Sequence, residues 1–470
     1  MAGLVRTLAA LPVVLAACGR LDFALRGTGG DPGDGGSTGS DATVTGSAAP
    51  RYAEVLDGNA TTPLIGGVLG QVAVAERFVT SATIANAAVT GQAMYESFGL
   101  VWLDDKGAPG TTSVLDSTSI CDLRALAASS SGVIAAGIAD SGATTPALGA
   151  CAIATARQDG VAIAVDTTGT QQLVAHLAAT SMNDQGWFAA AFSDGSVAAA
   201  GIYGIGGKLG SQMLPATTSG ENAWYARVDP STGEPIWSAT VNSTGVTYAG
   251  PISADGDELC MMGSFSGAVT VLGTQLTSAG SDDEWVARVD ATGAPRFVRQ
   301  VGTTGEESTT AGLAIAATAD GGCTAALVAG GDLVLDSISL PAADGPAVLL
   351  HFGASGTLAS GQRTSEVPML ARVPGGTYAA AACSQPCELG GVTYTPVDND
   401  IAVFALDDAL VATEVAAVTG GTSTFYGFAA VPPDVLAIGF TLGGPVTFGS
   451  TVLPQQTATQ NAIAVLGVPP

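Results

Sequence analysis

A strand–turn–strand pattern is the clearest regularity of this sequence. Apolar and polar positions alternate in Trp285–Val289 and again in Pro295–Val301, at the two-residue period of a β-strand. Between them, Asp290–Gly293 has the composition of a tight turn, because Asp bonds its own backbone and Gly accepts a positive φ. The stretch from Asp282 to Gly302 therefore predicts a β-hairpin.

The same hairpin recurs along the chain, with its turn glycines 60–64 residues apart. These glycines are Gly107, Gly169, Gly233, Gly293 and Gly356. A degenerate copy follows at Val403–Ala409, and a last strand at Ala462–Leu466 stops before its turn. Between the hairpins we expect a second element, an Ala-rich strand, a turn and another strand. Its copies are Leu123–Gly137, Trp187–Gly201, Ile252–Gly263 and Leu313–Gly330, with looser versions at Leu370–Ala382, Phe428–Gly439 and Gln71–Ile84.

Each period thus predicts four antiparallel strands, and about seven periods predict an all-β, seven-bladed β-propeller. The predicted units are 58–107, 108–169, 170–233, 234–293, 294–356, 357–409 and 410–470. The last unit lacks its fourth strand, and Ala49–Val55 repeats the start of the strand after Gly293. We therefore expect residues 49–57 to complete the last blade, pairing antiparallel with residues 461–466. A row of β-sandwich domains is the alternative, but those are nearer 100 residues each.

The repeat unit resembles the SBBP-type seven-bladed propeller repeats of secreted and lipid-anchored bacterial proteins. The resemblance lies in the order of its parts, an Ala-rich strand pair followed by EWVARVDATGAPRFVRQVG. The resemblance covers residues 50–470. It implies a fold and no activity, because propellers host unrelated functions.

The N-terminus predicts export and lipidation. Arg6 and the apolar run Leu8–Ala17 have the pattern of a signal peptide, and Leu15–Cys18 is similar to the lipobox of bacterial lipoproteins. The resemblance implies removal of residues 1–17, a lipid on Cys18 and, since Gly19 follows, an outer-membrane location. The propeller would face the periplasm or the cell surface. An ordinary secretory signal is the alternative. Residues 18–48, rich in Gly, Ser and Asp, predict a flexible tether, and the fold proper begins at 49.

Charge limits the partners. The formal net charge is −26, so the chain would repel phosphate backbones and we expect no nucleic-acid partner. We expect a monomer that meets the membrane only through its lipid, with an envelope protein or a glycan as partner.

Few residues of the sequence suggest a metal site or a catalytic site. The repeated turn aspartates suggest calcium, but one Asp followed by Gly is also what a tight turn selects, and we favour the turn role. These residues are Asp104, Asp166, Asp229, Asp290 and Asp407. His176 and His351, the two histidines, occupy strand positions in different units, so neither a triad nor a zinc site is predicted.

Cysteines predict one local bridge. Cys383 and Cys387 flank a Pro-containing turn, which in an exported protein favours a disulfide over a redox pair. Cys121, Cys151, Cys260 and Cys323 are expected as buried thiols, or with one bridge between Cys121 and Cys151.

Tryptophans are expected to pack between blades instead of forming a sugar-stacking platform. Trp102, Trp224, Trp237 and Trp285 lie on recurring strands, and Trp187 lies on an inner strand.

No catalytic, cofactor-binding or metal-binding residue is predicted. The sequence favours a non-catalytic scaffold or binding module, and the alternative is a polysaccharide hydrolase or lyase that uses the propeller mouth. That chemistry needs two carboxylates converging in one pocket.

Overall fold

The computed structural model describes residues 49–56, 64–68, 70–79, 81–91, 96–115, 122–140, 158–178, 185–204, 206–215, 222–243, 245, 247–305, 314–374, 376–454 and 460–468. The predicted signal segment, Cys18, the tether to residue 48, Cys121 and Cys151 lie outside these residues. The described chain is all-β apart from one short 3-10 helix, η1 (Ala342–Asp344). None of its helices is long and apolar enough to cross a membrane.

Five sheets contain the same four-stranded antiparallel meander, and we name each sheet after its innermost strand. The β2 sheet has β2 (Leu64–Val68), β3 (Gln71–Val79), β6 (Glu96–Leu103) and β7 (Pro109–Leu115). The β8 sheet has β8 (Asp122–Ala128), β9 (Gly132–Asp140), β10 (Gln158–Asp166) and β11 (Gln171–Ala178). The β12 sheet has β12 (Gln185–Ala191), β13 (Val197–Tyr203), β16 (Asn222–Asp229) and β17 (Glu234–Ser243). The β18 sheet has β18 (Thr247–Asp255), β19 (Glu258–Phe265), β22 (Asp283–Val289) and β23 (Pro295–Val301). The β24 sheet has β24 (Ala314–Ala317), β25 (Cys323–Val328), β28 (Ala347–Phe352) and β29 (Leu358–Thr364).

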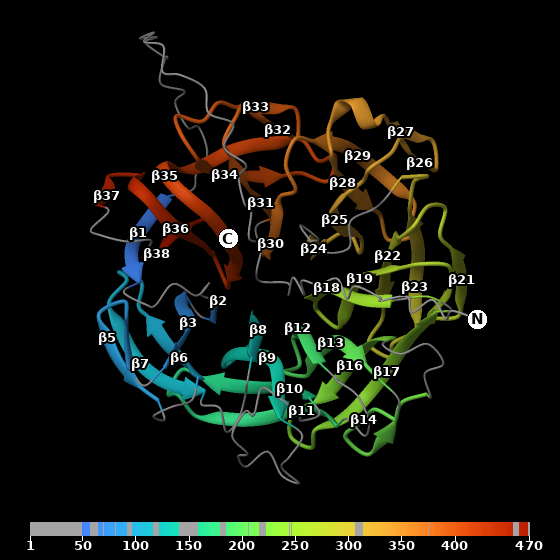
Figure 1. Ribbon diagram of the computed structural model, residues 1–470, viewed down its shortest axis with the longest axis horizontal. Coiled ribbons are helices and arrows are strands. Elements are labelled where there is room, and N and C mark those ends of the chain that lie inside the picture. The colour runs from blue at the N-terminus through green and yellow to red at the C-terminus, as the bar shows by residue number, and fades with distance from the viewer. Residues whose placement is uncertain are drawn as a thin grey trace, which may run out of the picture.

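A larger sheet joins two further groups of strands through one long strand, β35 (Ala412–Val431). The first part of β35 pairs with β34, and the rest, from Val418 on, pairs with β36. One group is β30 (Met369–Val373), β31 (Gly376–Cys383), β34 (Asp400–Leu406) and the first part of β35. The other is the last part of β35 with β36 (Val435–Phe448), β38 (Gln460–Gly467) and β1 (Ala49–Leu56). Figure 1 shows the sheets arranged around a common centre, with β2, β8, β12, β18, β24 and β30 nearest to it.

The two ends of the described chain pair as predicted. Strand β1 runs antiparallel to β38, with Tyr52 opposite Val465. Tyr52 is only 8% exposed, and its ring lies against Gly107, where a Cβ would come within 2.7 Å of it. The same contact joins Trp237 to Gly293 and Phe297 to Gly356. All five turn glycines adopt a positive φ, and Gly107, Gly293 and Gly356 also leave room for an aromatic ring. Tyr52 makes in the first turn the contact that Trp237 and Phe297 make in later ones.

The tryptophans of the recurring strands are core residues, as predicted. Trp285 is fully buried and meets Tyr225 of the neighbouring β12 sheet edge to face, with ring centroids 5.4 Å apart. The Tyr225 hydroxyl donates a hydrogen bond to the Met262 carbonyl of the β18 sheet. Apolar packing reinforced by such polar contacts holds successive sheets together.

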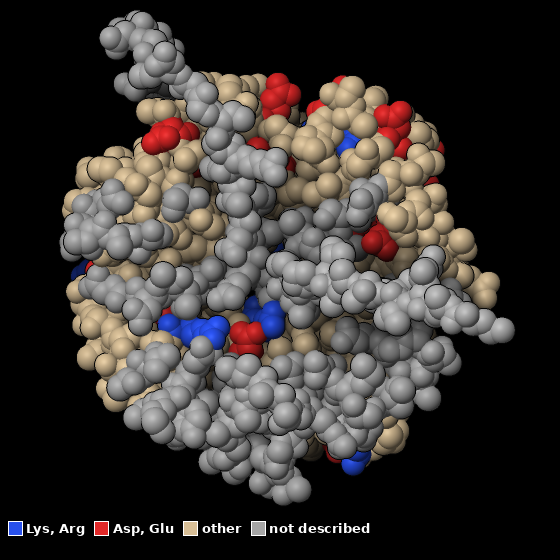
Figure 2. Space-filling model, in the orientation of Figure 1, with Lys and Arg blue, Asp and Glu red and all other residues tan. Residues whose placement is uncertain are grey.

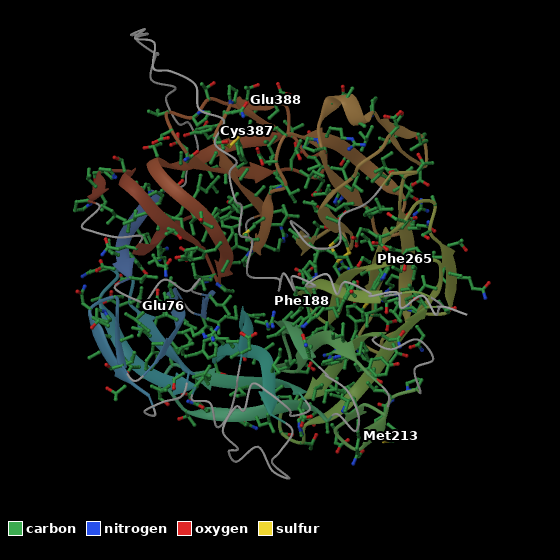
Figure 3. All side chains as sticks on the ribbon, viewed as in Figure 1. Glu76, Phe188, Met213, Phe265, Cys387 and Glu388 are labelled. Carbon is green, nitrogen blue, oxygen red and sulfur yellow. A yellow bond between two sulfur atoms is a disulfide. The ribbon has the colours of Figure 1, made fainter. Side chains whose placement is uncertain are left out.

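Two features differ from the sequence prediction. First, a short hairpin lies between the second and third strands of several units, so those units hold more than four strands. These hairpins are β4 (Ser81–Ile84) with β5 (Ala87–Thr90), β14 (Lys208–Leu209) with β15 (Gln212–Met213), β20 (Ala268–Val271) with β21 (Thr274–Thr277), β26 (Leu333–Leu335) with β27 (Ile338–Leu340), and β32 (Cys387–Leu389) with β33 (Val392–Tyr394). The end of β36 pairs likewise with β37 (Thr451–Leu453). Several of these hairpins lie at the rim in Figure 1, and Figure 3 places Met213 and Glu388 there, with Phe188 near the centre.

Second, the inner strand pair of the first unit begins earlier in the chain than the predicted segment Gln71–Ile84. It consists of β2 and β3, and the end of the predicted segment, from Ser81, belongs to the rim hairpin β4–β5. The apolar run of β2 contains two glycines and no alanine, so it did not match the Ala-rich pattern of the later units.

Candidate functional site

The repeated turn aspartates cap their own turns. Asp290 Oδ1 accepts hydrogen bonds from the Thr292 N–H at 2.9 Å, the Thr292 hydroxyl at 2.7 Å and the Ala294 N–H at 3.1 Å. Asp166 accepts the same three bonds from Thr168 and Thr170. Comparable bonds to the backbone occur at Asp104, Asp229 and Asp407. These contacts account for the repeated Asp as turn residues. Within the described ranges, no three His, Cys, Asp or Glu side chains come together to hold a metal ion.

We expect the turns to lose stability in acid. Hydrogen bonds from the Thr292 hydroxyl and N–H lower the pKa of Asp290, and Thr168 and Thr170 do the same for Asp166. A carboxyl with a lowered folded-state pKa stabilises the fold above its unfolded value, about pH 4, and this contribution is lost as pH falls through the folded pKa. Thermal unfolding midpoints should therefore fall as pH drops below about 4. A variant with both Asp→Asn changes should show a shallower fall, and an unchanged profile would contradict this origin.

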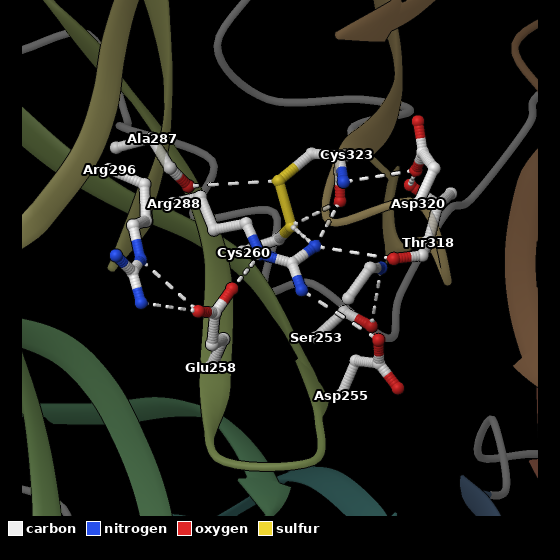
Figure 4. Close-up of polar contacts among 12 residues, drawn as sticks. Ser253, Asp255, Glu258, Cys260, Ala287, Arg288, Arg296, Thr318, Asp320 and Cys323 are labelled. Atoms are coloured by element: carbon white, nitrogen blue, oxygen red, sulfur yellow. Dashed lines mark hydrogen bonds and ion pairs between the residues drawn. A yellow bond between two sulfur atoms is a disulfide. The ribbon is translucent and has the colours of Figure 1, made fainter. Parts of the chain in front are cut away.

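Cationic side chains at equivalent register positions link neighbouring sheets. Arg227 of β16 binds Asp194 at 2.7 Å and reaches Asp257 of the β18 sheet at 3.3 Å. Arg288 of β22 binds Glu258 at 2.7 Å (Figure 4), and it donates to the Gly322 carbonyl of the β24 sheet. Both arginines are nearly fully buried and paired, so they serve the structure.

The two histidines stay apart, as predicted. His176 of β11 lies 2.8 Å from Asp159, in the β8 sheet. His351 of β28 lies 3.1 Å from Asp320, and its other ring nitrogen lies 3.1 Å from the Thr324 hydroxyl. This Thr–His–Asp order resembles a catalytic triad, but Thr324 is only 2% exposed and His351 only 1%. A substrate cannot reach the hydroxyl, so the arrangement is a buried polar link.

The structure contains two disulfides among the described cysteines. Cys383 and Cys387 are joined, which is the predicted local bridge. Cys260 and Cys323 are also joined, so the prediction of buried thiols at these two positions is wrong. Cys260 lies on β19 and Cys323 on β25, and the bridge ties the β18 and β24 sheets together (Figure 4). Their separation of 63 residues is one repeat, which places them on equivalent strands of neighbouring units.

The inner strands line an axis that solvent reaches. On β8 the residues from Arg124 to Ala128 are all partly exposed, although the strand lies at the middle of the molecule. On β18 the residues from Pro251 to Asp255 are partly exposed as well. Small and apolar side chains dominate these surfaces. Among the inner strands that the structure describes, the carboxylates are Asp122 at the start of β8 and Asp255 at the end of β18. They therefore stand at opposite ends of the axis.

Polar and aromatic residues occupy equivalent positions of successive sheets at the end of the axis where the inner strands begin, which we call the mouth. Asp122 pairs with Ile138 and Gln185 with Ile202, while Tyr248 pairs with Ser264. Each of these partner residues directly follows a glycine of its second strand, so Asp122, Gln185 and Tyr248 share one layer. The layer extends over three successive sheets.

Contacts within the mouth order its side chains. Asp122 forms an ion pair with Arg124 at 2.6 Å, with side chains 39% and 14% exposed. Gln185 Oε1 accepts a 2.6 Å hydrogen bond from the Trp187 indole N–H. The ring of Trp187 stacks on Tyr248, with centroids 6.0 Å apart and planes 17° apart. Figure 2 shows basic and acidic side chains close together near the middle of the face turned to the viewer.

Sequence reasoning did not single out Asp122, Arg124 or Tyr248. It placed Trp187 on an inner strand, which is confirmed, but not against Tyr248. The sequence did contain a usable signal. The first residues of β8, β12 and β18 are DLR, QGW and TYAG, and these starts carry polar and aromatic residues where the rest of each strand is rich in alanine and other small residues.

Comparison with known proteins gives no family. No protein-family model matches the sequence, and no curated protein matches it.

Solved structures show distant likenesses. An uncharacterised protein from Dyadobacter fermentans DSM 18053 is 9% identical, with 90% of this chain and 99% of that chain covered and a TM-score of 0.36. The Pyrococcus horikoshii acylaminoacyl peptidase is 10% identical, with 87% and 53% covered and a TM-score of 0.42. The Bacillus subtilis arabinanase Arb43A is 12% identical, with 57% and 89% covered and a TM-score of 0.24. Likenesses at this level carry no argument about what this chain does.

Proposed function

We propose that the chain is a lipid-anchored, seven-bladed β-propeller that serves as a non-catalytic binding module of the cell envelope. The ring consists of the five four-stranded sheets and the two groups that share β35. Support comes from the contacts of the innermost strands, which pass from β2 to β8, β12, β18, β24, β30 and β35, and from β35 back to β2. The pairing of β1 with β38 supplies the fourth strand of the last blade.

The observation that favours binding over catalysis is the composition of the axis. Glycoside hydrolysis uses two carboxyl groups about 5–10 Å apart on either side of the scissile bond. Of the described inner strands, β8 and β18 each carry one carboxylate, at opposite ends of the axis, and small apolar side chains lie between them. That lining suits a surface that contacts a ligand without transforming it. For this reason we do not favour the hydrolase or lyase alternative.

A capture experiment tests this function. The full chain is immobilised and exposed to envelope extract and envelope polysaccharides, and both retained material and cleavage products are measured. Ala127, partly exposed on β8, is changed to Trp to fill the axis, with Ala88→Trp on the exposed rim strand β5 as the matched control. We expect retention by the wild type and the rim variant, loss in Ala127→Trp, and no cleavage. Cleavage by the wild type would make the protein an enzyme, and unchanged capture by Ala127→Trp would move the site away from the axis.

The anchor is tested separately. Because Leu15–Cys18 has the lipobox pattern, Cys18→Ser should move the protein from the membrane fraction to the soluble fraction and prevent lipid-dependent gain in mass. Fractionation and intact-mass measurement on both forms check this. A Cys18→Ser protein that stays membrane-bound at unchanged mass would refute the lipoprotein proposal.

A further inference from the structure

The mouth combines an aromatic surface with hydrogen-bonding groups. Tyr248 is partly exposed and is backed by Trp187, which is only 8% exposed. The offset stack of the two rings and the hydrogen bond from Trp187 to Gln185 fix the orientation of this surface. A ligand that packs on Tyr248 therefore meets an ordered ring and loses little further side-chain entropy on binding.

In the same layer, on β8 and separated from Tyr248 by β12, stands a neutral ion pair. The Asp122 carboxylate is held by Arg124 at 2.6 Å and keeps 39% of its side chain exposed. The pair offers carboxylate acceptors and guanidinium donors side by side, which is the pattern that adjacent hydroxyl groups satisfy, since each hydroxyl both donates and accepts. Its net charge is zero.

These features discriminate among ligand classes. A phosphate or another polyanion would meet Asp122 and a chain of net charge −26. A purely apolar ligand would bury the Asp122–Arg124 pair without replacing its water contacts, at a high desolvation cost. A neutral ligand with hydroxyl groups along its edge and an apolar C–H face satisfies both the pair and the ring.

We propose that the mouth binds a neutral oligosaccharide, with the C–H face of one sugar on Tyr248 and the hydroxyls of a neighbouring sugar on Asp122 and Arg124. Asp122 and Tyr248 lie on β8 and β18, with β12 between them, so a chain of two or more sugars fits this span better than one. The inference rests on the proposed binding function and names its ligand class.

The test is direct binding of the full chain to an array of neutral and acidic oligosaccharides, followed by calorimetric titration of the best neutral ligand. Tyr248→Ala should weaken binding about tenfold, because it removes the stacking surface, whereas Tyr248→Phe should stay within about threefold. Asp122→Asn should weaken binding about tenfold or more, since hydrogen bonds to charged groups are the strong ones. Asp434→Asn is the matched control, because Asp434 forms a similarly exposed pair with Arg51 at 2.8 Å on other strands.

Each outcome either supports or overturns the proposed saccharide site. Loss in Tyr248→Ala and Asp122→Asn, with binding kept in Asp434→Asn, supports the proposal. If Tyr248→Ala fails to fold, Asp122→Asn against Asp434→Asn carries the test, because both carboxylates are exposed. A wild type that binds no neutral oligosaccharide overturns the proposal, as does equal binding by Asp122→Asn and Asp434→Asn. If an envelope protein is captured through the axis and no glycan binds, the binding module stands and the saccharide site falls. If the glycan binds and is cleaved, the site stands and the non-catalytic function falls.

Discussion

Deletion of β1, Ala49–Leu56, is expected to lower the free energy of unfolding by about 5–10 kcal/mol, comparable with the whole stability of a domain. The strand contributes Tyr52, Ala53 and Leu56 to the core, and Leu56 is fully buried. Each large buried side chain stabilises by roughly 1.5–3 kcal/mol, and each backbone hydrogen bond to β38 by about 1 kcal/mol. The deletion also exposes the edge of β38, which invites association between chains.

Urea unfolding of the full chain measures the effect. Deletion of an equal number of tether residues, 33–40, is the control and should leave the midpoint unchanged. Tyr52→Ala is the milder variant, with an expected loss of about 3 kcal/mol, because it removes the ring that covers Gly107. A β1 deletion that unfolds at the wild-type midpoint with the wild-type slope would show that the strand is a dispensable tail.

The pairing of β1 with β38 was predictable because it depends on features that a sequence displays. The last unit ends after its third strand, and the segment from Ala49 repeats the beginning of the strand that follows Gly293. The turn glycines recur at nearly constant spacing because each adopts a positive φ, and three of them also admit an aromatic ring. Such constraints act on single residue types at constant intervals and therefore survive as a visible period.

The rim hairpins were not predicted because their strands are only two to four residues long and the residues in their turns differ from one hairpin to the next. Gly273 and Gly449 serve two of these turns, but Asp336 occupies a left-handed position with φ 53° in another. The β2 strand was missed for a related reason, since glycines took the places that alanines hold elsewhere. Short alternations with changing turn residues fall below what periodicity can detect.

The residues that line the axis beyond the mouth could not be read from the sequence because bulges interrupt the inner strands. The register shifts between Leu123 and Ala125 on β8, between Gly186 and Phe188 on β12, and between Ala249 and Ile252 on β18. A bulge reverses which face the following residues occupy, so a simple alternation of two predicts the wrong side chains there. Asp122, Gln185 and Tyr248 precede these bulges, and their pairing with the second strands places them in one layer.

Replacement of Cys260 and Cys323 by Ala is expected to lower the free energy of unfolding by about 4 kcal/mol on the chain-entropy model. The bridge spans 63 residues, and closing so long a loop restricts the unfolded chain more than the Cys383–Cys387 bridge, which spans 4. The matched Ala variant of Cys383 and Cys387 should therefore lose only about 2 kcal/mol. Both pairs are buried, so the comparison varies the loop length more than the surroundings.

The position of the Cys260–Cys323 bridge should make its contribution to stability larger than its loop length alone predicts. It joins β19 to β25 at a contact between two sheets, where Arg288 donates to the Gly322 carbonyl beside Cys323. Without the bridge, that contact depends on side-chain packing and on the hydrogen bonds from Arg288 to the Thr318 and Gly322 carbonyls. Urea unfolding of both double variants, with thiol labelling of the wild type before and after reduction, measures the difference. Equal losses of unfolding free energy in the two variants, or labelling of Cys260 before reduction, would contradict a stabilising disulfide between the two sheets. A larger loss for the Cys260 and Cys323 variant would show that the β18 and β24 sheets are held together by a covalent bond as well as by their core.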